Sequence, residues 1–167
     1  MLITILSFLT GIESLSLLSK IDPYHIFPDT GAATIPNIDF LLLTQGQPDH
    51  AHPPTLEKID KSIPVIASQA ASNVVKQIGF TKIHTLKPGE NFKYNNLIIQ
   101  DNSGASVPNI ENGYIVKDFR GKGFYIEPHG YLDESLDKQD LDAVITPTMN
   151  LELPLVGSFV KGADVIP

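Results

Sequence analysis

The chain has 167 residues, of which 42% are hydrophobic and 19% are charged, and its formal net charge is −7. This apolar content excludes a disordered tail, and the length predicts a single domain over residues 1–167. Arg120 is the only arginine and the sequence has no basic run, so nucleic acid is not an expected partner.

The absence of cysteine excludes disulfides, thiolate metal ligands and thiol nucleophiles together. A metal ion would therefore be held by His, Asp, Glu or weaker oxygen donors. The same absence fits a reducing compartment, and we expect a cytoplasmic protein, with the plastid stroma as an alternative. The apolar segment 1–9 has no basic residue before Lys20, and Glu13 interrupts the apolar run, so no signal peptide and no membrane partner are expected.

The first half of the chain is predicted to alternate strands and helices. Apolar runs bounded by turn residues predict strands over 2–9, 14–21, 38–44, 63–67 and 82–86. A helix is expected over 55–61, because the prolines before it are tolerated in a first helical turn. A second helix should begin after Ser68, a good N-cap, and end at Ile78 before Gly79.

The second half is predicted to be richer in hairpins. Residues 91–100 indicate a hairpin with its turn at 94–97, and residues 114–118 and 123–126 indicate another pair around Arg120. A short helix over 133–140 and a buried strand over 142–146 complete the elements. The fold class is therefore mixed α/β, with hairpins beside βα units.

The densest polar cluster runs from Thr44 to His52, directly after the apolar strand at 38–44. Ligands collect at the carboxyl ends of strands in α/β proteins. Asp49, His50 and His52 could bind one metal ion, because two histidines spaced i and i+2 point the same way from an extended segment. The alternative is a loop in which Asp49 and His50 cap the following helix.

This segment resembles the signature of the metallo-β-lactamase-fold hydrolases, Ser/Thr-His-x-His-x-Asp-His. Here it stands as Thr44-Gln-Gly-Gln-Pro-Asp-His50. Segments 20–24, 63–68, 86–90 and 124–130 also fit that fold, so the similarity extends from about Lys20 to Thr146. It is greatest with the lactonase-like branch, in particular with cyanobacterial and plastid-type members that carry an Asp-His-x-His pattern. The resemblance implies a four-layered αββα sandwich and metal-dependent hydrolysis.

The departures from the signature decide how much of that chemistry carries over. Gln45 and Gln47 replace the His-x-His pair, the segment Asp101–Ser106 lacks the expected third histidine, and His129 stands about where a bridging aspartate belongs. Amide oxygens are much poorer zinc ligands than imidazole. The first zinc site of the family is therefore expected to be lost.

The resemblance leaves a site for one zinc or other divalent ion, held by Asp49, His50 and His129, with His52 or Glu127 as a fourth group. Such a site would activate water to hydrolyse a small ester, lactone or phosphorylated metabolite, and Asp49 could also accept the proton. In a second interpretation, Glu127 and His129 only belong to a turn. The protein is then a non-catalytic binding or assembly protein, or an inactive truncated member that keeps the fold without the dinuclear zinc site.

The resemblance also bears on the C-terminal residues. The family continues through further strands and helices past the position of Pro167, so the sandwich is expected to be incomplete there. Segments 151–156 and 163–167 would then lack covering partners. Exposed apolar surface of this kind predicts a homo-oligomer.

Overall fold

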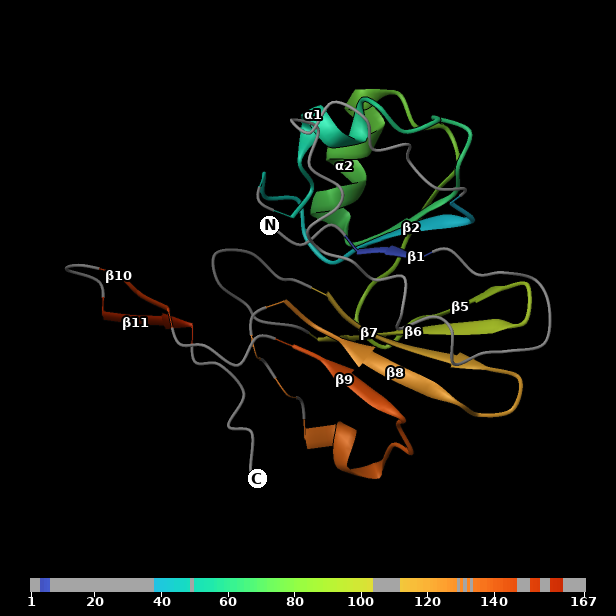
Figure 1. Ribbon diagram of the computed structural model, residues 1–167, viewed down its shortest axis with the longest axis vertical. Helices are drawn as coiled ribbons and strands as arrows, with labels where there is room; N and C mark the ends of the chain where they lie inside the picture. The colour runs from blue at the N-terminus through green and yellow to red at the C-terminus, as the bar shows by residue number, and fades with distance from the viewer. Residues whose placement is uncertain are drawn as a thin grey trace, which may run out of the picture. The chain divides into compact units, whose positions relative to one another are not determined.

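The computed structural model describes residues 4–6, 38–48, 50–103, 112–128, 130, 132, 134–146, 151–153 and 157–160, and for 4–6, 134, 151–153 and 157–160 it describes the backbone only. The chain divides into two compact units, residues 1–85 and residues 86–167. Each unit contains its own sheet (Figure 1). In the described part of the chain, no helix is both long and apolar enough to cross a bilayer.

The first unit contains a sheet of four short strands in the order β1-β2-β3-β4. Strand β1 is antiparallel to β2, whereas β2, β3 and β4 are mutually parallel. Helices α1 and α2 provide the crossovers between the parallel strands and lie on the same side of the sheet in Figure 1. The elements are β1 (Thr4–Leu6), β2 (Phe40–Leu43), α1 (Pro53–Leu56), β3 (Val65–Ala67), α2 (Gln69–Ile78) and β4 (Ile83–Thr85).

The apolar run at 38–44 forms the central strand β2, as the sequence predicts. All four of its residues are buried, and strands pair with both of its edges. Leu41 and Leu43 belong to a buried cluster that also contains residues of α2, among them Val75. The strand expected over 14–21 lies outside the described residues.

Helix α2 has the expected ends. The Ser68 hydroxyl accepts a hydrogen bond from the Ala71 amide at 3.3 Å, which satisfies one free amide of the first turn. At the other end Gly79 adopts φ 105°, a left-handed conformation that glycine adopts without steric cost. The predicted helix over 69–78 is confirmed.

Helix α1 is shorter than predicted and begins earlier, at Pro53. The α-helix ends at Leu56, and beyond it the Lys61 ammonium donates to the carbonyls of Leu56, Glu57 and Ile59 at 2.8, 2.8 and 2.6 Å. The side chain thus satisfies carbonyls that a longer helix would have bonded internally. Sequence patterns do not reveal capping by a side chain beyond the helix end, so the expected helix over 55–61 was misplaced.

The second unit contains a five-stranded sheet in the order β5-β6-β7-β8-β9. The first four strands form an antiparallel meander, and β9 is parallel to β8. A separate hairpin pairs β10 with β11. The elements are β5 (Asn91–Tyr94), β6 (Leu97–Ser103), β7 (Asn112–Asp118), β8 (Gly123–Ile126), the 3₁₀ helix η2 (Glu134–Lys138), β9 (Ala143–Ile145), β10 (Leu151–Leu153) and β11 (Gly157–Val160).

Both predicted hairpins are present. The β5–β6 turn contains Asn95 at φ 51°, in the left-handed region that asparagine tolerates better than most residues. In the β7–β8 turn the Asp118 carboxylate accepts from the amides of Arg120 and Lys122, at 2.8 and 3.0 Å. These bonds and a 2.8 Å contact with the Arg120 guanidinium lower the pKa of Asp118, although its partial burial opposes them.

Two predictions for the end of this unit need correction. The helix expected over 133–140 is a single 3₁₀ segment, η2, and the side chain of Gln139, which follows η2, accepts a hydrogen bond from the Lys117 ammonium of β7 at 2.9 Å. The strand predicted to be buried is β9, but Val144 is 51% exposed. Among the described strands, β9 pairs only with β8, so it lies at an edge of the sheet.

Candidate functional site

The predicted polar cluster follows β2 at the carboxyl end of the strand. Thr44 and Gln45 are both buried, and His50 is only 7% exposed although it belongs to a loop. The Ser68 amide donates to the Leu43 carbonyl at 3.1 Å, which ties the end of β2 to the start of the α2 segment. His50 is thus a buried residue of the first unit, in the loop that follows its central strand.

Gly46 allows this loop to lie against helix α2. A Cβ atom at this position would come within 2.7 Å of the Ala70 carbonyl carbon and oxygen. These are backbone atoms of the first helical turn, which cannot move aside as a side chain can. Glycine at position 46 is thus needed for the close approach, which holds the segment leading to His50.

The backbone around His50 is a turn, not the extended segment that the argument from spacing requires. The amides of His50 and Ala51 both donate to the Gln47 carbonyl, at 2.9 and 2.7 Å. His50 and His52 are therefore not related by the two-residue repeat of a strand. The spacing argument for one shared ion therefore lacks its extended backbone, and the role of both histidines as ligands stays a prediction.

His52 is the N-cap residue of α1, and its side chain makes no capping hydrogen bond. Its Nδ1 atom lies 2.9 Å from the Thr55 hydroxyl oxygen, which fixes the ring against the first turn of the helix. A histidine held in this way presents its Nε2 atom to other partners, as metal-binding histidines commonly do. His52 and not His50 therefore occupies the N-cap position of α1, and Asp49, the other residue expected to cap this helix, lies outside the described residues.

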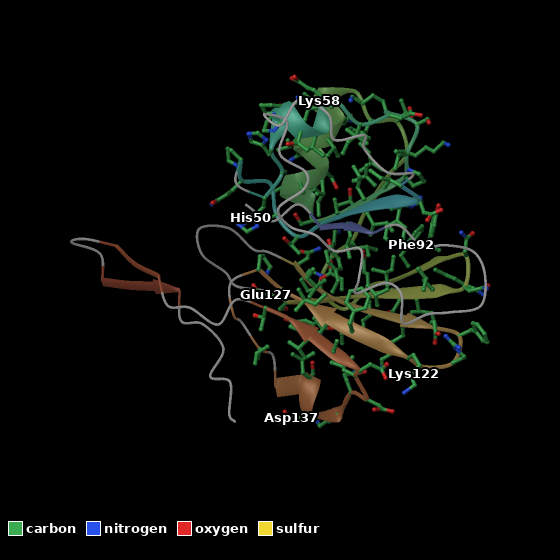
Figure 2. All side chains as sticks on the ribbon, viewed as in Figure 1. His50, Lys58, Phe92, Lys122, Glu127 and Asp137 are labelled. Carbon is green, nitrogen blue, oxygen red and sulfur yellow. The ribbon has the colours of Figure 1, made fainter. Side chains whose placement is uncertain are left out.

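The predicted ligand set is only partly described. Asp49 and His129 lie outside the described residues, and Glu127 belongs to the second unit, whereas His50 and His52 belong to the first. Figure 2 labels His50 and Glu127. Within the described part of the chain, no three His, Asp or Glu side chains gather closely enough to hold a metal ion.

Glu127 directly follows β8 and is completely buried. Its amide donates to the Ile145 carbonyl at 3.1 Å, which extends the pairing of β8 with β9 by one residue. Thr146, which directly follows the parallel strand β9, has a buried hydroxyl oxygen without a hydrogen-bond partner among the described residues. The carboxyl ends of two neighbouring parallel strands thus carry polar side chains, as in the ligand sites of α/β proteins.

Asp101, near the end of β6, belongs to a buried polar cluster that the sequence did not reveal as a site. Its carboxylate accepts from the Asn112 amide, which also donates to the Leu86 carbonyl at 3.0 Å and lies 3.2 Å from the Tyr114 hydroxyl. Burial, reinforced by the negative charge of Glu90, raises the pKa of Asp101 to about 8, although the bond from Asn112 opposes this shift. Asp101 is therefore largely protonated at neutral pH.

One feature of the sequence could have indicated this cluster. Alternation along β6 places Leu97, Ile99 and Asp101 on the same face of the sheet, and all three are buried. An aspartate in phase with two core residues must be either hydrogen-bonded or neutral. Its proximity to Asn112 depends on the pairing of β6 with β7, which the local sequence does not determine.

Comparisons with known proteins agree with this architecture. Residues 7–165 match the family model of the beta-lactamase superfamily domain. The isothiocyanate hydrolase from Delia radicum gut bacteria is similar in structure, with a TM-score of 0.63 and 18% sequence identity over 78% of this chain and 59% of that one. A protein from Veillonella parvula, described as a possible metal-dependent hydrolase, has a TM-score of 0.60 and 14% identity over 75% of this chain and 54% of that one.

The chain belongs to the beta-lactamase superfamily domain family, and the predicted α/β sandwich class is confirmed. At these identities, the likeness to the two solved structures concerns the fold alone. The chain spans between half and three-fifths of the length of each. No curated protein sequence gives a significant match.

Proposed function

We propose that this chain is a metal-dependent hydrolase of a small ester, lactone or phosphorylated metabolite. The metal ligands in this proposal are Asp49, His50, His52 and His129. The observation that carries it is the placement of His50, buried at the carboxyl end of β2 in the loop that resembles the family's metal-binding signature. Membership of the beta-lactamase superfamily domain family supports the reaction class.

The donor chemistry of the described residues suits zinc or a similar divalent ion. Imidazole nitrogen is a preferred zinc ligand, and the Thr55 hydroxyl holds the His52 ring in one orientation. A bound metal ion of this kind lowers the pKa of a water ligand to about 7. In the proposal Asp49 accepts the proton from that water, and Glu127 is the alternative fourth group.

A non-catalytic binding protein is the second candidate, and Gln45 favours it. Gln45 is only 3% exposed, so a neutral amide lies buried where the family signature has its first histidine. A chain with this substitution retains at most one of the two zinc sites of the family. The two candidates differ in whether the remaining donors bind a metal ion tightly.

The metal content of the purified protein distinguishes the metal-dependent hydrolase from the non-catalytic binding protein. The protein is purified without an affinity tag or added metal, and its metals are quantified by mass spectrometry. We expect about one zinc, manganese or iron ion per chain, with loss of this metal in His50→Ala and weaker binding in His52→Ala. His84→Ala is the matched control, because His84 is an exposed histidine of β4 in the same unit.

Since His50 is buried, its replacement could unfold the loop instead of removing a ligand. His50→Gln keeps a polar side chain of similar size, and circular dichroism before metal analysis shows whether each variant is folded. A folded wild-type protein that takes up no metal, even after incubation with zinc, contradicts the hydrolase. That result would favour the non-catalytic candidate.

A further inference from the structure

The central strand β7 of the second sheet begins with Asn112 and Gly113, which form the one Asn-Gly pair of the sequence. Such a pair is chemically labile in an unfolded chain, because glycine has no side chain to shield its amide nitrogen. That nitrogen attacks the carbonyl carbon of the asparagine side chain and forms a cyclic imide. The bond from this carbon to the amide nitrogen breaks, and ammonia leaves with the displaced proton. Water then opens the imide to aspartate or isoaspartate.

The fold of the second unit requires asparagine at position 112. Its side-chain amide donates to the Asp101 carboxyl group and, at 3.0 Å, to the Leu86 carbonyl, and the residue is only 2% exposed. An ionised aspartate at this position would have no proton to donate and would place a second carboxyl group beside Asp101. Buried acceptors that lose their donor destabilise the folded state. The acid form of residue 112 is therefore incompatible with this cluster.

The same fold requires glycine at position 113. Successive residues of a strand face opposite sides of the sheet, so this position faces away from the Asp101 cluster. A Cβ atom on Gly113 would come within 2.5 Å of the Tyr125 hydroxyl oxygen and 2.9 Å of a ring carbon. Tyr125 is completely buried on β8, so its ring cannot swing into solvent. Two separate packing requirements thus place a labile pair in the central strand.

The native structure protects the pair that it requires. Imide formation brings the side-chain carbon of Asn112 onto the Gly113 nitrogen, and the main chain must rotate out of the extended strand conformation to allow this. The hydrogen bonds to Asp101 and Leu86 also hold the amide group that has to leave. In the register, Asn112 pairs with Ser103 of β6. Reaction at Asn112 therefore requires the sheet to open at this point.

We propose that Asn112 is a deamidation site whose reactivity is controlled by folding. It is inert in the native second unit and reacts when β7 separates from β6. The reaction is one-way, because the aspartate product cannot donate to Asp101 and Leu86. The isoaspartate product also lengthens the main chain by a carbon atom and disrupts the alternation of the strand. A chain that stays unfolded is thus withdrawn from the folded pool, whether or not the protein binds a metal ion or hydrolyses a substrate.

Peptide mapping of the full chain in its folded and unfolded states tests the site. The protein is held at one temperature and a slightly alkaline pH, in buffer and in guanidinium chloride, and samples taken over time are digested and analysed by mass spectrometry. We expect the acid form of residue 112 to accumulate in guanidinium chloride and to stay at its starting level in buffer. Asn95 is the internal control, because it is exposed in a turn and folding should change its rate much less.

Equal accumulation at position 112 in the two conditions overturns protection by the fold. Asn112→Gln tests the route through the imide, because its longer side chain closes the ring much less readily. This variant is measured in guanidinium chloride only, so the result does not depend on whether it folds. It should remain an amide at this position, and conversion to the acid at the wild-type rate would overturn the proposed reaction.

Refolding of the aged protein tests the one-way step. After removal of guanidinium chloride, the folded fraction should contain less of the acid form than the starting mixture, and equal proportions would overturn this step. Asn112→Asp should fail to fold where the wild type refolds, as measured by circular dichroism. The reciprocal variant Asp101→Asn with Asn112→Asp restores an amide beside a carboxyl group and should recover folded protein. A reciprocal variant that folds no better than Asn112→Asp would contradict the role assigned to this pair.

Discussion

Asp101 shows how far a single residue can depart from its ordinary chemistry in this protein. An aspartate carboxyl group in water ionises near pH 3.8, but burial, reinforced by the Glu90 charge, raises the pKa of Asp101 to about 8 against the opposing hydrogen bond from Asn112. The same environment raises the pKa of Tyr114, first because of its own burial and then because of the Asp101 charge. The cluster is therefore uncharged at neutral pH, which lets it lie in the core without counter-ions.

This shift predicts how stability depends on pH. The folded state keeps the Asp101 proton up to about pH 8, whereas the unfolded state loses it near 3.8. The stability that the proton contributes is fully present below pH 3.8, where both states keep the proton. It falls as the pH rises from 3.8 to about 8. The slope is at most about 1.4 kcal/mol per pH unit, the value for one proton. Urea unfolding at several pH values in this window measures it.

Asp101→Asn should remove this component of the pH dependence and be more stable than the wild type near pH 8. Asp137→Asn, at an exposed position of η2, should follow the wild-type curve. If the wild type and Asp101→Asn show parallel pH profiles, Asp101 ionises in the folded protein as it does in water. That result would contradict the shifted pKa.

At the scale of elements, helix α2 has the most completely predictable ends. Ser68 and Gly79 are recognisable in the sequence because capping depends on residues within one turn of the helix end. The end of α1 was not predictable for the opposite reason. Lys61 reaches back to the Leu56 carbonyl, and whether it does so depends on the fold of the intervening chain.

Loss of the α2 cap should destabilise the first unit. Ser68→Ala removes the acceptor of the Ala71 amide, and N-cap replacements of this kind cost about 1 kcal/mol. Thermal unfolding should show a Tm lower by several degrees, as is usual for a change of this size. Ser62→Ala provides a control at an exposed serine outside the helix and should leave Tm nearly unchanged. An equal loss in both variants would contradict the capping role.

At the scale of the whole molecule, the second sheet retains exposed apolar side chains. Ile98 of β6 is 49% exposed and Val144 of the edge strand β9 is 51% exposed. The register from β6 through β7 and β8 to β9 places both on the same face of that sheet. An exposed edge strand with apolar side chains favours pairing with a second chain. The homo-oligomer expected from the sequence is therefore predicted to form through β9 and this face of the second sheet.

Light scattering coupled to size-exclusion chromatography tests this association. The wild-type protein should elute above the 18.2 kDa mass of one chain, and Val144→Lys should shift it toward the monomer by placing a charge on the edge strand. Lys93→Ala is a control on β5, the strand at the opposite end of the sheet order. A wild-type protein that is monomeric at high concentration would contradict the prediction.

The sequence by itself predicted the strands of the two large sheets and helix α2, because hydrophobic periodicity, caps and turn residues act over a few neighbours. It misplaced α1 and did not predict β10 or β11. It also located the polar loop that ends at His50, since a polar run after a buried strand is visible without a structure. Only the tertiary structure decided that this loop turns at Gln47 and that Asn112 meets Asp101. The contact of Asn112 with Asp101 depends on the register of two paired strands, which the local preferences of either strand do not determine.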